Sequence, residues 1–127
     1  MRHPDTAVPI GIIDPDLSSR VAAARLLSAH GHPAISFVSI ADYAAHVASA
    51  KPIPVLFVDA GEYLKGGAGG RPLLDGSVVV AIASEARLTD IGRALAAGCV
   101  DYLVRPLESC MLTQALDQAM AALPPAR

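Results

Sequence analysis

Tryptophan is absent from the sequence and the other aromatic residues are scarce, with two phenylalanines and three tyrosines among 127 residues. A core with so few large rings has to be built mainly from aliphatic side chains, and hydrophobic residues make up 53% of the chain. That composition and length suit one folded domain. We therefore expect a single domain over residues 1–127, with a loose lead-in over residues 1–8 and a tail over residues 124–127.

Cysteine, net charge and long apolar runs are also in short supply. Two cysteines, Cys99 and Cys110, are too few for a disulfide framework and suit a reducing compartment. The formal net charge of -2 gives no sign of a nucleic-acid surface. The longest apolar run, Val78 to Ala83, is far too short to cross a membrane, and the N-terminus lacks a signal-peptide pattern. We expect a cytoplasmic protein that binds neither nucleic acid nor membrane.

Short apolar segments alternate with helical patterns along the chain. The segments read as strands buried on both faces of a parallel sheet, and they are Ile10–Ile13, Ala34–Val38, Ile53–Val58, Val78–Ala83 and Cys99–Val104. The helical stripes between them include one formed by Leu17, Val21, Ala24 and Leu27, and another formed by Ile91, Ala94 and Leu95. This alternation predicts an α/β fold with an open, doubly wound, five-stranded parallel sheet and helices on both faces.

The connection after the third predicted strand is the weakest helical pattern. Glu62–Lys65 could form about one turn before a run of glycines stops it. The run at 66–70 lacks the ending of a phosphate-binding loop, so we interpret it as an irregular, flexible connector. The third helix is therefore expected to be short or missing.

Polar residues follow the predicted strands where ligands bind in such folds, at the carboxyl ends of the strands. Asp14 and Asp16 follow the first strand, Asp59 ends the third, and Arg105 follows the fifth. Together with the sequence AGCVDYLVRP at positions 97–106, these residues make the chain resemble the receiver domain of two-component response regulators. The resemblance extends from about Ile10 to Leu123. It implies the CheY-like, flavodoxin-like strand order 2-1-3-4-5.

The resemblance also implies roles for individual residues. Asp59 matches the phosphoacceptor, which would take a phosphoryl group from a histidine kinase or a phosphotransfer protein. Asp14 and Asp59 would hold Mg²⁺, which neutralises charge during the transfer. Tyr102 matches the aromatic that switches rotamer, and a cis peptide is expected before Pro106. The face of the fourth helix, fifth strand and fifth helix would bind an effector or a second copy, and its expected exposed residues are Arg87, Arg93, Glu108, Gln114 and Gln118.

Three positions depart from the receiver pattern. Pro15 stands where the second acid should be and offers no side-chain oxygen to a metal. Ala83 stands where a hydroxyl is expected, and its neighbour Ser84 should face the opposite side, because neighbouring residues of a strand do. Arg105 replaces the lysine, which exchanges a compact ammonium for a planar fork.

These departures leave a second interpretation of the acids and the base. Asp59 can be paired with Arg105 through two hydrogen bonds, with Asp14 helping to hold the arginine, and no metal or phosphate is then needed. Asp16 can serve as the N-cap of the first helix, which we favour over metal binding.

Two classes of function remain. In the first, the chain is a signalling module and not an enzyme: a phosphoprotein acting in phosphorelay through Asp59 or, as we favour, a pseudo-receiver for phosphate-independent docking or dimerisation. In the second, it is a small-molecule-binding or enzymatic flavodoxin-like domain, because one fold supports many functions. The sequence contains neither a glycine-rich dinucleotide fingerprint nor a nucleophile elbow, which speaks against the second class.

Overall fold

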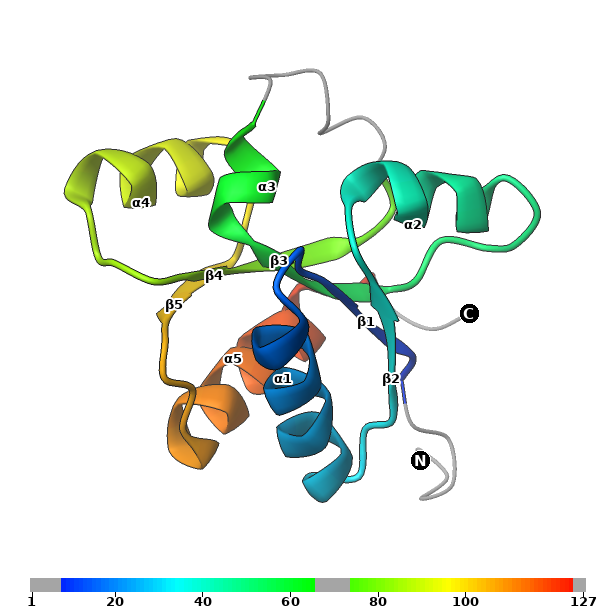
Figure 1. The fold of residues 1–127 in the computed structure, drawn as a ribbon, viewed down its shortest axis with the longest axis horizontal. Coiled ribbons are helices and arrows are strands. Elements are labelled where there is room, and N and C mark those ends of the chain that lie inside the picture. Colours follow the sequence, from blue (N-terminus) through cyan, green and yellow to red (C-terminus); the bar gives the residue numbers. More distant parts are fainter. Residues whose placement is uncertain (1–7, 66–73, 125–127) are drawn as a thin grey trace.

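The computed structural model describes residues 8–65 and 74–124, and the expected loose lead-in, glycine-rich connector and tail lie almost wholly outside these ranges. Five strands form one parallel sheet in the order β2-β1-β3-β4-β5, which confirms the expected flavodoxin-like order (Figure 1). The strands are β1 (Ile10–Ile13), β2 (Ala34–Phe37), β3 (Val55–Asp59), β4 (Val78–Ala83) and β5 (Asp101–Val104).

Helices cover both faces of the sheet. They are α1 (Leu17–Ala29), α2 (Ile40–Val47), α3 (Ala60–Leu64), α4 (Leu88–Ala96) and α5 (Ser109–Ala122). Figure 1 shows α1 and α5 on one face and α2, α3 and α4 on the other. The third helix has five residues, so the expectation of a short helix is confirmed. No helix within the described ranges is long and apolar enough to cross a membrane.

Alternating residues of the central strands build two separate apolar layers. In β3, Leu56 and Val58 belong to the layer under α2, α3 and α4, and Val55 and Phe57 belong to the layer under α1 and α5. All four of these side chains are fully buried. Cys99 is buried in the first layer, where desolvation raises the pKa of its thiol to about 11. Packing of these two layers holds the sheet between its helices, and the sheet in turn determines where the ends of its strands lie.

Burial on both faces holds for the central strands but was wrong for the edge strand β2. Ile35 of β2 is 49% exposed, and β2 lies at the edge of the sheet, with a neighbouring strand on one side only. The predicted stripe of α1 was also wrong in its first half, since Leu17 is 63% exposed and Val21 39%. The buried residues of α1 are Ala23 and Leu27. In this alanine-rich helix the apolar pattern is weak, so packing against the sheet decides which face is buried.

Candidate functional site

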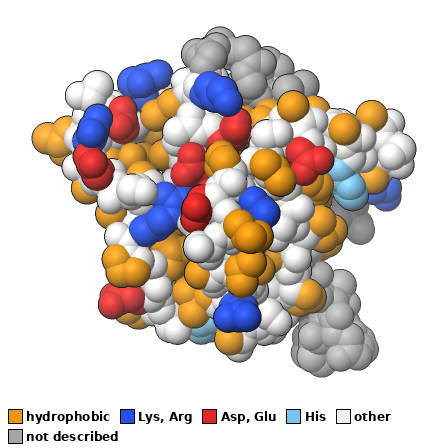
Figure 2. Space-filling view, viewed as in Figure 1, with side chains coloured by type: hydrophobic (Ala, Val, Ile, Leu, Met, Phe, Trp, Pro, Cys, Tyr) orange, Lys and Arg blue, Asp and Glu red, His pale blue; other side chains and the backbone are white. Residues whose placement is uncertain are grey.

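Four strands deliver the predicted site residues to one rim of the sheet. Asp14 follows β1, Asp59 ends β3, Ser84 follows β4 and Arg105 follows β5. Their convergence follows from the parallel sheet, in which the carboxyl ends of the strands lie at the same edge. In the space-filling view, acidic and basic side chains lie next to one another near the centre of this side of the molecule (Figure 2). The predicted acids and base are therefore brought together.

The guanidinium of Arg105 is the centre of this arrangement. Its Nη2 donates to Asp14 Oδ2 at 2.8 Å and to Asp59 Oδ1 at 2.9 Å. Its Nε donates to Ser19 Oγ at 2.6 Å, and its Nη1 donates to Ser84 Oγ at 3.2 Å. The expected pairing of Asp59 with Arg105, assisted by Asp14, is thus present, but Arg105 makes one hydrogen bond to each acid and not the expected two to Asp59. We call these five residues the rim cluster.

Backbone groups occupy the outer oxygens of both carboxylates. Asp14 Oδ1 accepts a hydrogen bond from the backbone N–H of Asp16 at 2.9 Å, and Asp59 Oδ2 accepts one from Glu62 at 3.1 Å. The second of these bonds makes Asp59 the N-cap of α3. Each of the four carboxylate oxygens therefore already has a donor supplied by the chain.

The rim cluster is shielded from water to different degrees. The side chain of Asp14 is 4% exposed, whereas those of Arg105 and Asp59 are both 22% exposed. Burial disfavours the charge of Arg105, but its hydrogen bonds to Asp59 and Asp14 outweigh that cost and raise its pKa. Breaking a shielded pair of this kind leaves an uncompensated charge, so the cluster should be rigid.

Asp16 lies apart from the rim cluster. Its Oδ2 accepts a hydrogen bond from the backbone N–H of Ser19 at 2.9 Å, which makes Asp16 the N-cap of α1. The prediction of an N-cap role is confirmed. The cap also fixes the start of α1, which places the Ser19 hydroxyl beside Arg105.

Magnesium does not fit this arrangement. Mg²⁺ requires close to octahedral coordination by oxygens at about 2.0–2.1 Å. The inward oxygens of Asp14 and Asp59 face one guanidinium nitrogen, Pro15 contributes no side-chain oxygen, and Asp16 caps a helix. Within residues 8–65 and 74–124 no group of three or more His, Cys, Asp or Glu side chains is placed to hold a metal ion. We therefore derive no chemistry from a metal at this rim.

At the end of β4, the structure confirms the expectation for Ala83 and contradicts the one for Ser84. Ala83 is buried and lines a cavity without offering a hydroxyl, as expected. Ser84 was expected to face away from the site, which was wrong. The strand ends at Ala83, so the alternation of strand side chains no longer applies and the Ser84 hydroxyl accepts from Arg105. Ser19 was missed altogether, because sequence spacing does not fix the rotation of α1.

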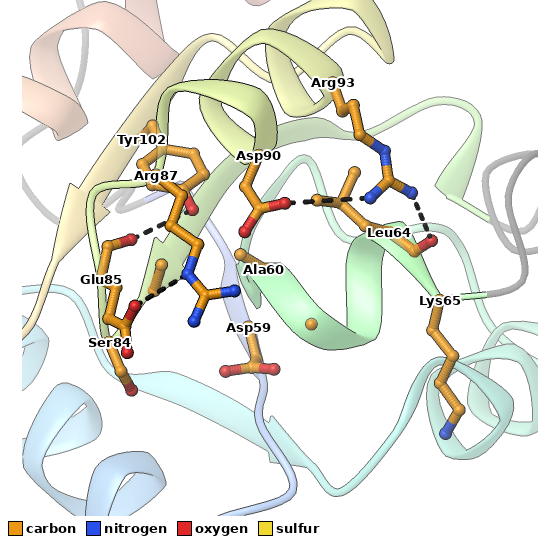
Figure 3. A pocket seen from close by; sticks show the side chains of 12 residues that line it. Asp59, Ala60, Leu64, Lys65, Ser84, Glu85, Arg87, Asp90, Arg93 and Tyr102 are labelled. Carbon is orange, nitrogen blue, oxygen red and sulfur yellow. Dashed lines mark hydrogen bonds and ion pairs between the residues drawn. The ribbon is translucent and has the colours of Figure 1, made fainter.

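A cavity of about 480 Å³ lies beside the rim cluster, between α3 and the β4–α4 connection (Figure 3). Four of its charged side chains form two ion pairs. The Arg87 Nε contacts Glu85 Oε2 at 2.8 Å, and Arg93 Nη1 lies 3.8 Å from Asp90 Oδ1. The other two charged lining residues, Asp59 and Lys65, pair outside the lining, with Arg105 and Glu62.

Tyr102 lines the same cavity from β5. Its ring packs on the apolar layer under α2, α3 and α4, and its hydroxyl donates to the carbonyl oxygen of Glu85 at 3.5 Å. Partial burial raises the pKa of this hydroxyl. The residue occupies the place that its proposed switch role requires, and that role stays a prediction. The peptide before Pro106 is cis, as expected.

The proposed docking face is open to solvent. All five residues expected to be exposed there are exposed, namely Arg87, Arg93, Glu108, Gln114 and Gln118. The structure adds two leucines of α4, Leu88 at 86% and Leu95 at 49% exposure. Leu95 was expected in the buried stripe of its helix, but the small Ala94 faces the sheet in its place. We call α4, β5 and α5 with these side chains the output face.

Comparisons with known proteins find the same architecture in solved structures. A putative pilus assembly-related protein from Burkholderia pseudomallei matches with a TM-score of 0.81 at 21% identity, over 98% of this chain and 97% of that one. A response regulator from Thermotoga maritima matches with a TM-score of 0.76 at 17% identity, over 92% and 100%. A response regulator receiver domain protein from Clostridium thermocellum gives 0.74 at 18% identity, over 90% and 94%.

The chain has the fold of response-regulator receiver domains. No family model matches the sequence, and no curated protein matches it either. At identities this low the likeness establishes the receiver fold alone.

Proposed function

We propose that this receiver-fold domain is a signalling module that works without phosphorylation, as a protein-docking or dimerisation domain. The observation that carries the proposal is the position of Arg105, whose guanidinium nitrogen binds both Asp14 and Asp59. Phosphoryl transfer to a carboxylate needs cations that neutralise the approach of two negative groups. Here the available positive charge is already bound by the acceptor and its neighbour.

Asp59 is also poorly placed as a free nucleophile. One of its oxygens faces Arg105 and the other caps α3. A phosphoryl group on either oxygen would have to replace one of these bonds. The acids Asp14 and Asp59 of the receiver pattern are therefore retained, but they support a fixed rim in which α3 and β5 are held in one arrangement.

The output face supplies the contact surface of this proposal. Leu88 and Leu95 expose apolar surface on α4, next to the charged side chains of Arg87 and Arg93. Exposed apolar groups surrounded by polar ones are typical of protein contact sites. The partner would be an effector protein or a second copy of the chain.

One similar structure comes from a protein described as pilus assembly-related, and others come from response regulators. The receiver fold thus occurs in proteins given both descriptions. That range supports a domain whose output is contact with another protein. The alternative, a small-molecule site in the cavity beside the rim, gains little support from a lining whose charged side chains are all engaged in ion pairs.

Self-association gives the direct test. Sedimentation velocity would compare the unsubstituted protein, Asp59→Asn and Leu88→Glu, each with and without Mg²⁺ and acetyl phosphate. We expect equal association of the first two, no response to acetyl phosphate, and association weakened at least ~10-fold in Leu88→Glu. Leu17→Glu is the matched control, because Leu17 is an exposed leucine on α1, outside the output face.

Two results would contradict the proposal. One is association that appears only after acetyl phosphate and disappears in Asp59→Asn, which would make a histidine kinase or a phosphotransfer protein the natural partner. The other is equal weakening by Leu88→Glu and Leu17→Glu, which would remove the output face from the account. If the protein is monomeric throughout, the same two leucine variants are compared as baits for an effector.

A further inference from the structure

The two acids of the rim cluster share a single point of positive charge. Asp14 Oδ2 and Asp59 Oδ1 both lie within 2.9 Å of the same atom, Arg105 Nη2. Two carboxylates that face one another closely repel unless a cation lies between them. In this chain the cation is a side chain, and it arrives from the end of β5.

We propose that the guanidinium of Arg105 takes the place of a divalent cation at this rim. The unsubstituted protein then binds no Mg²⁺ between Asp14 and Asp59, and removal of the guanidinium opens a cation site there. This inference deepens the proposed function and rests on it, since both require that Asp59 is already neutralised by the chain itself.

The neighbours of Arg105 hold its side chain in this position. Its Nε donates to the half-buried Ser19 at 2.6 Å and its Nη1 to Ser84 at 3.2 Å, so each of the three nitrogens has an acceptor. Its backbone N–H donates to the carbonyl of Ala83 at 2.8 Å. A lysine has one ammonium group and could not make these contacts from separate, rigidly spaced nitrogens.

A metal ion and this guanidinium exclude one another. Both are cations and both would bind the same two oxygens, so a divalent ion could enter only if Arg105 moved away and left its bonds to Ser19 and Ser84. With Arg105 gone, the two oxygens would face each other with no counter-charge, and hard carboxylate oxygens are the ligands that Mg²⁺ and Mn²⁺ prefer.

Manganese binding tests this directly, with Mn²⁺ followed by electron paramagnetic resonance and Mg²⁺ by calorimetry. The proteins are the unsubstituted chain, Arg105→Met, Arg105→Met with Asp14→Asn, and Arg25→Met. The last is the matched control, because Arg25 is an exposed arginine of α1 outside the rim cluster. We expect Arg105→Met to bind Mn²⁺ at least ~10-fold more tightly than the unsubstituted chain, and the double variant to lose that gain.

Arg105→Lys keeps the experiment decisive if Arg105→Met does not fold, because it retains a positive charge while freeing part of the site. It should also bind Mn²⁺ more tightly than the unsubstituted protein. Equal binding by the unsubstituted protein and both Arg105 variants would overturn the inference, and so would a gain that survives Asp14→Asn.

The outcomes separate this inference from the proposed function. An unsubstituted protein that binds Mn²⁺ as tightly as Arg105→Met, yet associates independently of acetyl phosphate, overturns the inference alone. An unsubstituted protein that binds no Mn²⁺, yet associates only when acetyl phosphate is present, overturns the proposed function alone.

Discussion

The rim cluster and the output face contain similar charged residues but use them differently. On the rim, Arg105 binds two acids whose side chains are 4% and 22% exposed. On the output face, Arg87 pairs with Glu85 of the β4–α4 connection, and these side chains are 68% and 64% exposed. Shielded ion pairs with several hydrogen bonds hold secondary-structure elements in place. Exposed ion pairs contribute little to the free energy of unfolding, so their side chains can turn to a binding partner at little cost. The comparison separates a rim that fixes the fold from a surface that is free to bind.

The strongest test of this contrast is Asp14→Ala. The change removes a buried carboxylate, leaves Arg105 with one acid and frees the backbone N–H of Asp16. We expect the free energy of unfolding to fall by about 3 kcal/mol, measured by urea denaturation. Asp16→Ala is the matched neighbour, since that acid is an exposed N-cap and should cost about 1 kcal/mol. Equal losses in the two variants would contradict the contrast.

Asp59 should contribute less than Asp14 because it is more exposed. Asp59→Ala removes a hydrogen bond to Arg105 and the cap of α3, and we expect a loss of about 2 kcal/mol. Asp59→Asn keeps a capping oxygen and should lose about 1 kcal/mol. Urea denaturation would measure both variants, and a larger loss for Asn than for Ala would refute the assignment of the cap.

The output face should tolerate the loss of an acid. Asp90 lies 3.8 Å from Arg93 on α4, and its side chain is 34% exposed. Asp90→Ala should change the free energy of unfolding by no more than about 0.5 kcal/mol. A loss comparable to that of Asp14→Ala would mean that the two regions do not differ in the way described.

The smallest effect on stability is expected for Leu88→Glu. Leu88 is 86% exposed and begins α4, where an acid is favourable to the helix dipole. The thermal midpoint should therefore stay within about 2 °C of that of the unsubstituted protein in a melt followed by circular dichroism. A clear destabilisation would show that the leucine packs on its own fold and does not serve a partner.

Much of the fold was predictable because β-strands and their ends leave strong local patterns. The runs at Ile10–Ile13 and Val78–Ala83 match β1 and β4 at both ends, and the motif at positions 97–106 indicated the receiver fold. The choice between a metal site and an ion pair was also open to sequence reasoning, since an arginine offers a planar fork of several donor nitrogens where a lysine offers one compact ammonium.

Other features depend on contacts that the sequence pattern does not specify. The roles of Ser19 and Ser84 follow from the rotation of α1 and from the residue at which β4 ends. Leu17 and Leu95 are exposed because other residues face the sheet, namely Ala23 and Leu27 in α1 and Ala94 in α4. Alanine-rich helices have several faces of similar apolarity, so packing against the sheet determines which face of each helix is buried.

Phosphorylation of the unsubstituted protein tests the central claim most directly. The protein would be incubated with Mg²⁺ and acetyl phosphate under conditions that label an ordinary receiver domain, then examined by intact mass spectrometry beside Asp59→Asn. We expect no gain of about 80 Da in either protein, because Arg105 already neutralises Asp14 and Asp59. A gain in the unsubstituted protein that is absent from Asp59→Asn would show a working phosphoacceptor and would contradict the account.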